Sequence, residues 1–364
     1  MSLAWFLIVL IIVLDIQSRI FDRWGPRGLS YKRTFNTDAV FEGEEVQMVE
    51  QIRNKKLLLM PWLRIESKID SDLQFQQSAN LSIRHDEFHT SLFSLMPYTG
   101  ITRRHRVFCK KRGCYRLNSV SLTFGDPFGV REKSKQLRLE AQLLVYPKIL
   151  EFDQIPFVCR SWMGDIMVKR WIISDPFYVA GIRAYQPGDS LNRISWKASA
   201  RLGDLLVNSY DHTSDPKAMI YLNLDIEEGM WRHVTDKELI ERALSIAASM
   251  LAKLTDEGIA VGFASNGHLI DDKDEPVIIL PQSGASQLTF ILGNMAMMLI
   301  ERVFTFYTFL ESEIKRDTDP MDILIMTAFV SDRLENQIER LVEKGHSVEI
   351  FDLSLLDKGG EEPA

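Results

Sequence analysis

The chain has 364 residues, of which 46% are hydrophobic, so it is long enough for two domains with separate cores. Its formal net charge of -7 argues against nucleic acid as the main partner and leaves small molecules, proteins or a membrane. The three cysteines, Cys109, Cys114 and Cys159, form no tight framework, and we predict that they are free thiols in a reducing compartment.

The first segment, residues 1–24, is predicted to be a retained membrane anchor. Leu3–Leu14 is uninterrupted apolar sequence that ends at Asp15. A helix over these residues reaches about 21 Å, which is short against a hydrocarbon core of about 30 Å. Local thinning of the bilayer or snorkelling of Arg19 would close the gap, and a buried core helix is the alternative. The segment lacks the charge pattern and cleavage site of a signal peptide.

Basic residues follow this apolar run, and they predict its orientation. They are Arg19, Arg23, Arg27, Lys32 and Arg33. Because positive charge favours the cytoplasmic side of a membrane, we expect one N-terminal helix in the inner (cytoplasmic) membrane, with the bulk of the chain in the cytoplasm.

Residues 30–150 are predicted to form an antiparallel β-sandwich. Short segments of alternating polarity are separated by turn residues, and no long helical period interrupts them. Gly125–Gly129 is a turn at the end of one of these strands. The densest basic run lies in this region, at Arg103, Arg104, Arg106, Lys110, Lys111, Arg112 and Arg116. It indicates either a solvated strand edge or contact with anionic membrane lipid.

Residues 151–216 are predicted to be a connector that carries a basic helix from about Leu191 to Arg201. Arg193, Lys197 and Arg201 are four residues apart and form one cationic stripe. A solvated helix face is one interpretation of this stripe, and a binding surface is the other. Trp196 beside it is typical of a core anchor, with a ligand platform as the alternative.

Residues 217–356 alternate between strands and helices, which predicts a mainly parallel sheet with helices on both faces. The predicted strands are Ala218–Asp225, Ile259–Ala264, Met321–Ala328 and Ser347–Leu353. The predicted helices are Asp236–Asp256, Gly284–Leu299, Glu301–Ile314 and Asp332–Lys344. With the sandwich and the anchor, the expected fold class is a multidomain α+β protein.

Three groups of residues carry a resemblance to a known family. They are Arg112, Gly113 and Tyr115; Asp126, Pro127, Phe128 and Gly129; and Gly188, Asp189, Arg193, Ile194, Trp196, Lys197, Ser199, Ala200 and Arg201. In this order and spacing they resemble the family named domain of unknown function 58. The resemblance implies a von Willebrand factor A-like C-terminal domain in a bacterial membrane protein. It also implies association with MoxR-type AAA+ ATPases and other membrane proteins.

A von Willebrand A-like domain that binds Mg²⁺ uses Asp-x-Ser-x-Ser after its first strand, because hard cations require converging oxygen ligands. Here Asp225 keeps the first position, both serines are absent, and Thr327 stands about where the last acidic ligand is expected. We therefore expect no bound metal. A degenerate site of Asp225, Glu227 and Thr327 that gathers Mg²⁺ differently is the alternative.

The function expected from these observations is that of a membrane-anchored binding or assembly protein rather than an enzyme. Its expected partner is a MoxR-type AAA+ ATPase, which rests on the family resemblance. The expected binding surface consists of Asp189, Arg193, Trp196, Lys197 and Arg201, whose cations supply charge-assisted contacts. Two alternatives stay open: a metal-dependent adhesion module, and a hydrolase that uses Ser199 or Asp225.

Overall fold

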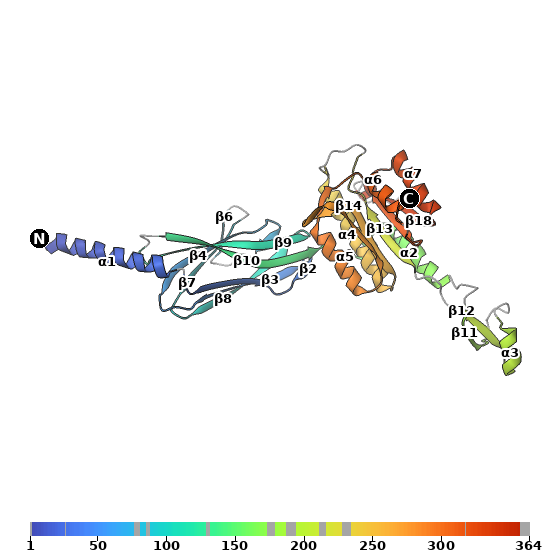
Figure 1. Cartoon of the computed structure of the whole chain (residues 1–364), viewed down its shortest axis with the longest axis horizontal. Coiled ribbons are helices and arrows are strands. Elements are labelled where there is room, and N and C mark those ends of the chain that lie inside the picture. Colours follow the sequence, from blue (N-terminus) through green and yellow to red (C-terminus); the bar gives the residue numbers. More distant parts are fainter. Residues whose placement is uncertain are drawn as a thin grey trace. The chain divides into compact units, whose positions relative to one another are not determined.

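The computed structural model of this chain describes residues 2–25, 27–75, 81–84, 88–128, 132–172, 179–186, 194–210, 216–227, 234–316 and 318–356 (Figure 1). The chain divides into two compact units, Met1–Lys148 and Ile149–Ala364. The finer predicted division into four segments stays a prediction.

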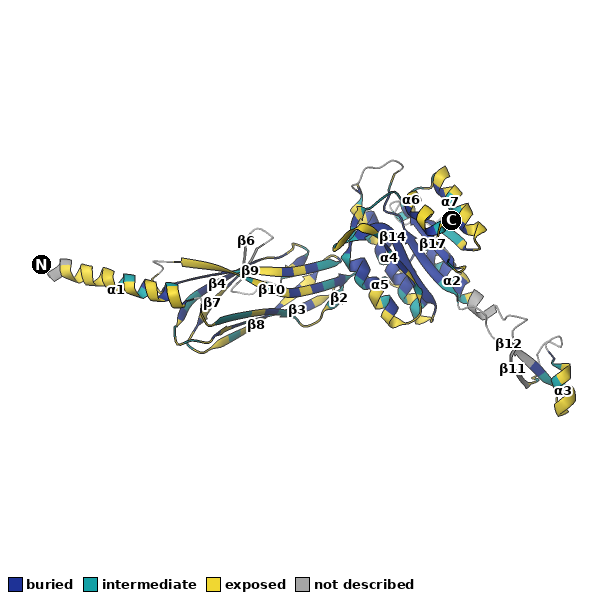
Figure 2. Ribbon diagram, in the orientation of Figure 1, coloured by how far each residue is buried: buried dark blue, intermediate teal, exposed yellow. Residues whose placement is uncertain are grey.

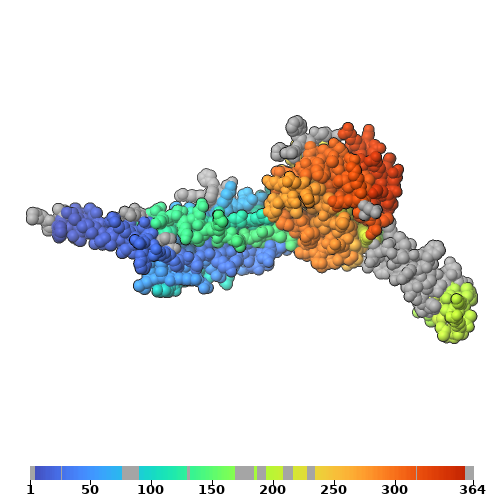
Figure 3. All heavy atoms as spheres, in the orientation of Figure 1, coloured from blue at the N-terminus to red at the C-terminus, as the bar shows by residue number. Residues whose placement is uncertain are grey.

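The first unit begins with helix α1, Ser2–Trp24. Its apolar side chains from Trp5 to Val13 are exposed (Figure 2; blue in Figure 3). Asp15, Arg19 and Asp22 interrupt the apolar sequence. Among the described residues, no helix is both long enough and apolar enough to cross a membrane. The predicted spanning helix is therefore not borne out, and attachment of residues 1–24 to a membrane stays a prediction.

Two sheets follow α1 in the first unit. Their strands are β1 (Leu29–Phe35), β2 (Ala39–Phe41), β3 (Glu45–Asn54), β4 (Met60–Lys68), β5 (Leu73–Phe75), β6 (Leu81–Arg84), β7 (Phe88–Leu95), β8 (Gly100–Cys109), β9 (Gly113–Gly125) and β10 (Glu132–Tyr146). One sheet has the order β1-β3-β8-β5, and the other has the order β2-β10-β9-β4-β7-β6. The described pairs are antiparallel, except that β2 pairs in parallel with β10.

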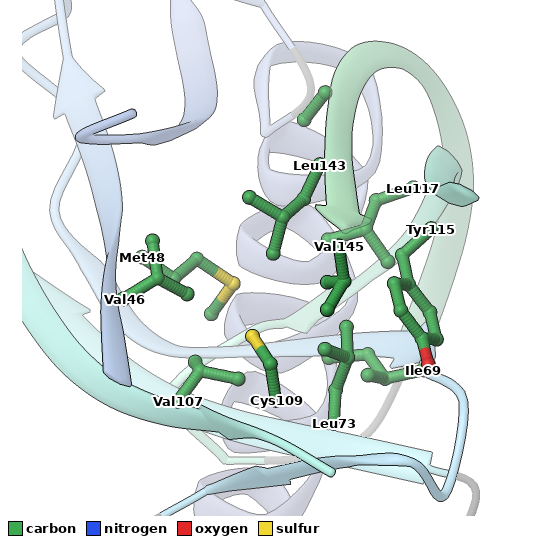
Figure 4. Packing of buried hydrophobic residues seen from close by; sticks show 11 residues of the cluster. Val46, Met48, Ile69, Leu73, Val107, Cys109, Tyr115, Leu117, Leu143 and Val145 are labelled. Atoms are coloured by element: carbon green, nitrogen blue, oxygen red, sulfur yellow. The ribbon is translucent and has the colours of Figure 1, made fainter. Parts of the chain in front are cut away.

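The two sheets pack face to face through alternate residues of their strands. Burial along β3 alternates almost perfectly, because successive side chains of a strand point to opposite faces. Met48 and Val107 of one sheet meet Leu117 and Leu143 of the other in a single buried cluster (Figure 4). Cys109 lies in the same cluster as a free thiol, and burial raises its pKa to about 11.

A buried ionic cluster lies inside this sandwich, between the apolar contacts. Arg33 Nη2 lies 2.6 Å from Glu50 Oε1, and both side chains are fully shielded from solvent. The Tyr31 hydroxyl donates to Glu50 Oε1 at 2.6 Å, and His105 Nε2 lies 3.0 Å from Glu50 Oε2. Burial is the main cause that raises the pKa of Tyr31, so the phenol stays protonated as a donor.

This cluster also joins the two sheets. Arg33 on β1 donates to the hydroxyl of Ser67 on β4 at 2.8 Å, and Ser91 on β7 donates to Glu50 on β3 at 3.3 Å. A slip of one residue in either sheet would separate these partners and leave a charge buried without compensation. The cluster therefore specifies how the sheets align.

We predict that Glu50→Leu lowers the free energy of unfolding by about 3–5 kcal/mol, because it leaves the Arg33 guanidinium buried without its carboxylate. The double variant Arg33→Met with Glu50→Leu should recover much of this loss, since it removes both charges. Denaturant unfolding followed by circular dichroism measures both effects. Glu66→Gln is the matched control, because Glu66 pairs with Arg64 on the half-exposed face of the same unit and should cost less than about 1 kcal/mol. A single variant no less stable than the control would contradict this account.

The second unit contains a mixed sheet with the order β15-β14-β13-β17-β18, in which β16 also pairs with β14. Its strands are β13 (Lys217–Leu222), β14 (Ala260–Leu269), β15 (Asp272–Gln282), β16 (Met298–Arg302), β17 (Asp322–Thr327) and β18 (Ser347–Asp352). Its helices are α2 (Phe157–Ile172), α4 (Lys237–Asp256), α5 (Ala285–Met297), α6 (Phe306–Ile314) and α7 (Asp332–Glu343), with short 3₁₀ turns at Phe152–Gln154 and Leu353–Leu356.

The predicted von Willebrand A-like, mainly parallel sheet is therefore wrong. Parallel pairing joins β14, β13, β17 and β18, but β15 and β16 both run antiparallel to β14. The turn between Leu269 and Asp272 has two residues, and a connection that short can only reverse the chain into a hairpin. The two predicted helices Gly284–Leu299 and Glu301–Ile314 both extend into Met298–Arg302, whereas this segment forms a strand against β14.

Helices cover both faces of this sheet. Met219 and Tyr221 of β13 pack with Phe309 of α6 and Leu334 of α7 in one buried cluster. Ala218, Ile220 and Leu222 of β13 point to the opposite face and are buried too. Helix α4 contacts β13 and β14. The α4 helix begins where the side chain of Asp236 accepts a hydrogen bond from the Leu239 N–H.

Buried His346, at the start of β18, makes the stability of this unit depend on pH. Its Nδ1 accepts a hydrogen bond from the Met321 N–H at 3.3 Å, and burial, with Lys344 nearby, holds its pKa below the ordinary value of 6.5. The unfolded chain then binds more protons than the folded chain just below that value. Stability is therefore fully present above pH 6.5 and is lost as pH falls through the folded pKa.

We predict that the melting temperature falls between about pH 7 and about pH 5 and that His346→Gln makes this fall shallower, because glutamine does not titrate. Thermal melts of both proteins across this range, followed by circular dichroism, measure the slope. Equal slopes for the two proteins would contradict a contribution from His346.

Candidate functional site

Polar side chains gather where the parallel strands of the second unit end. Asp225 follows β13 by three residues, Thr327 ends β17, and Asn266 lies in β14. The carboxyl ends of neighbouring parallel strands meet at one edge of a sheet, which brings these residues together. All three are buried.

Donors from three residues surround the Asp225 carboxylate. Arg302 Nη1 lies 2.8 Å from its Oδ1, and the backbone N–H of Phe306 donates to its Oδ2 at 2.8 Å. Asn266 Nδ2 adds a longer bond of 3.3 Å to Oδ1. Since Phe306 is the first residue of α6, Asp225 also stabilises the positive end of that helix.

The other residues of the predicted metal site do not converge on this carboxylate. The hydroxyl of Thr327 accepts from Asn223 Nδ2 at 3.0 Å and donates to the Phe329 carbonyl at 2.7 Å. Glu227 is exposed. Within the part of the chain that the structure describes, no group of three or more acidic, histidine or cysteine side chains is arranged to hold a metal ion. The residues present do not fit Mg²⁺, because the Arg302 guanidinium lies where a cation would compensate Asp225.

Sequence inspection identified Asp225 and Thr327 but missed Arg302 and Asn266, which complete the cluster. Arg302 is a cation at the end of the short apolar segment Met298–Arg302. A charged residue beside an apolar run is a weak signal by itself. Its partner is 77 positions away, so only the folded chain shows the pairing.

We predict that Arg302→Ala lowers the free energy of unfolding by about 3–5 kcal/mol, because Asp225 then stays buried without its cation. Lys315→Ala is the matched control: the Lys315–Glu311 pair on α6 is exposed and should contribute less than about 1 kcal/mol. Denaturant unfolding measures both values. In the same assay Mg²⁺ should leave the wild-type melting temperature unchanged, and a clear rise with Mg²⁺ would contradict the guanidinium as the compensating charge.

The predicted basic helix lies in a small element of its own, α3 (Trp196–Leu202), beside the strand pair β11 (Val179–Ala184) and β12 (Leu206–Tyr210). It starts later than predicted because Ile194 pairs with Val207 in an isolated β-bridge. Gly203 ends the helix in the left-handed conformation, as expected for a helix C-terminus. Two of the predicted binding residues, Asp189 and Arg193, lie outside the described residues.

The three remaining predicted residues, Trp196, Lys197 and Arg201, lie exposed on α3 (Figure 2). Trp196 is 66% exposed, so its interpretation as a core anchor is wrong. Leu202, at the end of α3, is also exposed, so α3 presents apolar and cationic side chains together. Exposed apolar groups next to cations are typical of surfaces that bind other molecules.

Ser199 on the same helix has a structural contact. Its Oγ accepts a hydrogen bond from the Leu206 N–H at 2.9 Å, and the Ser195 N–H donates to the Leu206 carbonyl at 2.9 Å. These bonds hold β12 against α3. The hydroxyl on which the alternative of a hydrolase would depend thus helps to fix the helix that carries Trp196.

Residues 181–357 match the sequence model of the family described as "Protein of unknown function DUF58". The chain is 22% identical over 270 residues to "Uncharacterized protein YeaD" of Bacillus subtilis (strain 168), an alignment that covers 72% of this chain and 62% of that protein. The chain thus spans about 62% of the curated relative that it matches. The family resemblance drawn from the sequence is confirmed for residues 181–357.

Solved structures give only remote similarity. A non-cellulosomal cohesin from Archaeoglobus fulgidus has a TM-score of 0.22 and 7% identity, over 32% of this chain and 91% of that chain. The major pilin SpaD from Corynebacterium diphtheriae has a TM-score of 0.25 and 10% identity, over 30% of this chain and 34% of that chain. The CARDB domain of the PF1109 protein from Pyrococcus furiosus has a TM-score of 0.21 and 11% identity, over 32% of this chain and 94% of that chain. Scores this low support no conclusion about function.

Proposed function

We propose that this chain is a membrane-attached binding and assembly protein whose partner is an AAA+ ATPase of the MoxR type. The observation that carries the binding role is the exposure of Trp196 beside Lys197 and Arg201 on α3. A tryptophan that stays in water lacks the free energy that burial of its apolar ring would contribute. Protein interfaces are enriched in tryptophan and arginine. The identity of the partner rests on the family resemblance.

Attachment to a membrane is supported by α1, whose apolar side chains from Trp5 to Val13 face solvent. Contiguous exposed apolar surface of this kind marks contact with a protein or a lipid phase. The basic residues that follow the apolar run favour a cytoplasmic position for the rest of the chain, at the inner membrane.

Binding rather than catalysis is supported by the contacts of the two residues on which an enzyme would depend. Ser199 holds β12, and Asp225 is neutralised by Arg302. In the described part of the chain, no specific contact favours the alternatives of a metal-dependent adhesion module or a hydrolase.

The test is to extract the full-length tagged protein from its native membrane in mild detergent and to identify what co-purifies. The variant Trp196→Ala with Lys197→Ala and Arg201→Ala should recover at least about tenfold less AAA+ ATPase, because anchor residues of an interface often contribute about 2 kcal/mol each. The variant must keep the wild-type melting temperature, which is expected because α3 buries none of its residues.

The matched control variant changes exposed residues of α7, Arg340→Ala and Val342→Ala. It should retain the ATPase at the wild-type level. Equal recovery of the ATPase with the folded α3 variant and with wild type would remove α3 as the binding surface. Absence of an AAA+ ATPase from all three samples would contradict the proposed partner.

A further inference from the structure

Large apolar side chains are exposed at the end of the sandwich where α1 joins it. Leu57 lies in the loop between β3 and β4, and Met96 and Tyr98 lie in the loop between β7 and β8. Phe128 lies in the turn after β9, and Trp24 is the last residue of α1. Each of these five side chains is more than half exposed.

Hydrogen bonds hold these segments next to one another. Lys56 Nζ donates to the Trp24 carbonyl at 3.1 Å and to the neighbouring Gly25 carbonyl, which fixes the β3–β4 loop to the end of α1. The Tyr98 N–H donates to the Lys56 carbonyl at 3.2 Å, which joins the β7–β8 loop to the same place. Trp62 Nε1, in β4, donates to the Asp126 carbonyl at 3.3 Å and positions the turn that carries Phe128.

Positive charge surrounds these apolar side chains. The exposed cations at this end are Arg23, Arg27, Arg53 and Lys55. Of the nearby acids, Asp22 pairs with Lys133 at 2.8 Å, Asp126 is buried, and Glu132 is exposed. The exposed surface is therefore apolar at its tips and cationic around them.

Tyr98 is exposed and lies in a turn with a strained backbone. The turn from Met96 to Thr99 has Pro97 at its second position, and Thr99 donates twice to the Met96 carbonyl, from its N–H at 3.4 Å and its hydroxyl at 2.8 Å. Tyr98 at the third position has a φ of 56°, in the left-handed region, where such turns normally use glycine. Glycine would suit this backbone better, so the tyrosine costs folding free energy at this position.

We propose that this end of the sandwich, formed by Trp24, Leu57, Met96, Tyr98 and Phe128 with their neighbouring cations, docks on the surface of an anionic phospholipid bilayer. The proposal rests on the membrane attachment in the proposed function and names the surface that would accompany it. Trp and Tyr rings favour the headgroup region, where the apolar body and the polar tip are both satisfied. Arg and Lys beside them are attracted to anionic lipid.

One feature favours a bilayer over a protein at this surface. Helix α1 exposes apolar side chains from Trp5 to Val13, and its last residue, Trp24, lies at this end of the sandwich. A bilayer that holds α1 therefore also meets the loops.

The experiment measures flotation of the full-length protein with phosphatidylcholine vesicles that contain phosphatidylglycerol. The test variant is Leu57→Ser with Met96→Ser and Tyr98→Gly, and the control is Leu280→Ser with Val342→Ser, two exposed sites of the second unit. The test variant should bind the vesicles at least about tenfold more weakly than wild type, since three apolar side chains no longer leave water on binding. The control should match wild type. Equal partition of the test variant would overturn the proposal.

The charges are tested by Arg27→Gln with Lys55→Gln, against Lys273→Gln in an exposed hairpin. Each removed cation should lower partition on phosphatidylglycerol vesicles about fivefold at low salt, and the difference should shrink as salt is raised. The Lys273 variant should bind as wild type does. If the loss were the same on pure phosphatidylcholine vesicles, anionic lipid would not be the ligand.

A second measurement reports on the loop itself, independently of α1. Peroxide oxidises exposed methionine to the sulfoxide, so the oxidation rate of Met96 follows its access to water. This rate should fall when the wild-type protein binds phosphatidylglycerol vesicles. An unchanged rate on bound protein would overturn the proposal.

Failure here is distinguishable from failure of the proposed function. The loop variant should still recover the AAA+ ATPase, and the α3 variant should still bind vesicles. A loop variant that binds vesicles as wild type does but loses the ATPase would assign this surface to the protein partner and overturn docking on lipid. Tyr98→Gly alone should keep or raise the melting temperature, because glycine suits a positive φ.

Discussion

A carboxylate that is removed from water has to be compensated, and each unit of this chain meets that constraint with an arginine. In the first unit Arg33 pairs with Glu50 between the sheets, and in the second unit Arg302 pairs with Asp225 at the edge of the mixed sheet. Both pairs join segments far apart in the sequence. Because a buried charge without its partner is strongly unfavourable, these contacts tie strand alignment and helix position to a single arrangement.

The Asp225–Arg302 pair also explains how a polar strand end is satisfied within the fold. The carboxylate neutralises the guanidinium and accepts the first N–H of α6, so its oxygens are used inside the fold. The proposed function and the proposed contact with lipid use surfaces that still expose apolar side chains after folding. Those surfaces are α1, α3 with Trp196, and the loops around Tyr98, each of which exposes apolar side chains next to cations.

The local sequence was sufficient to predict a helix where the segment satisfies its own backbone hydrogen bonds. The helix predicted at Asp236–Asp256 is α4, because its apolar period and the capping side chain of Asp236 lie within one segment. The same reasoning failed at Met298–Arg302, an apolar segment that continues a helical pattern but forms β16 against β14. Pairing with a strand about 30 positions earlier decides that choice, and tertiary contacts override local propensity there.

The sequence by itself determined the alternation of the sandwich strands, the positions of α4 and α7, and the residues Lys197 and Arg201 as surface candidates, because these follow from spacing within one segment. Only the tertiary structure decided that Trp196 is exposed, that Asp225 is paired with Arg302, that the second sheet is mixed, and that Leu57, Tyr98 and Phe128 lie together beside α1. The exposure of a side chain and the identity of its contacts depend on segments that are distant in the sequence. Burial and charge compensation over the whole fold decide which of these segments come together.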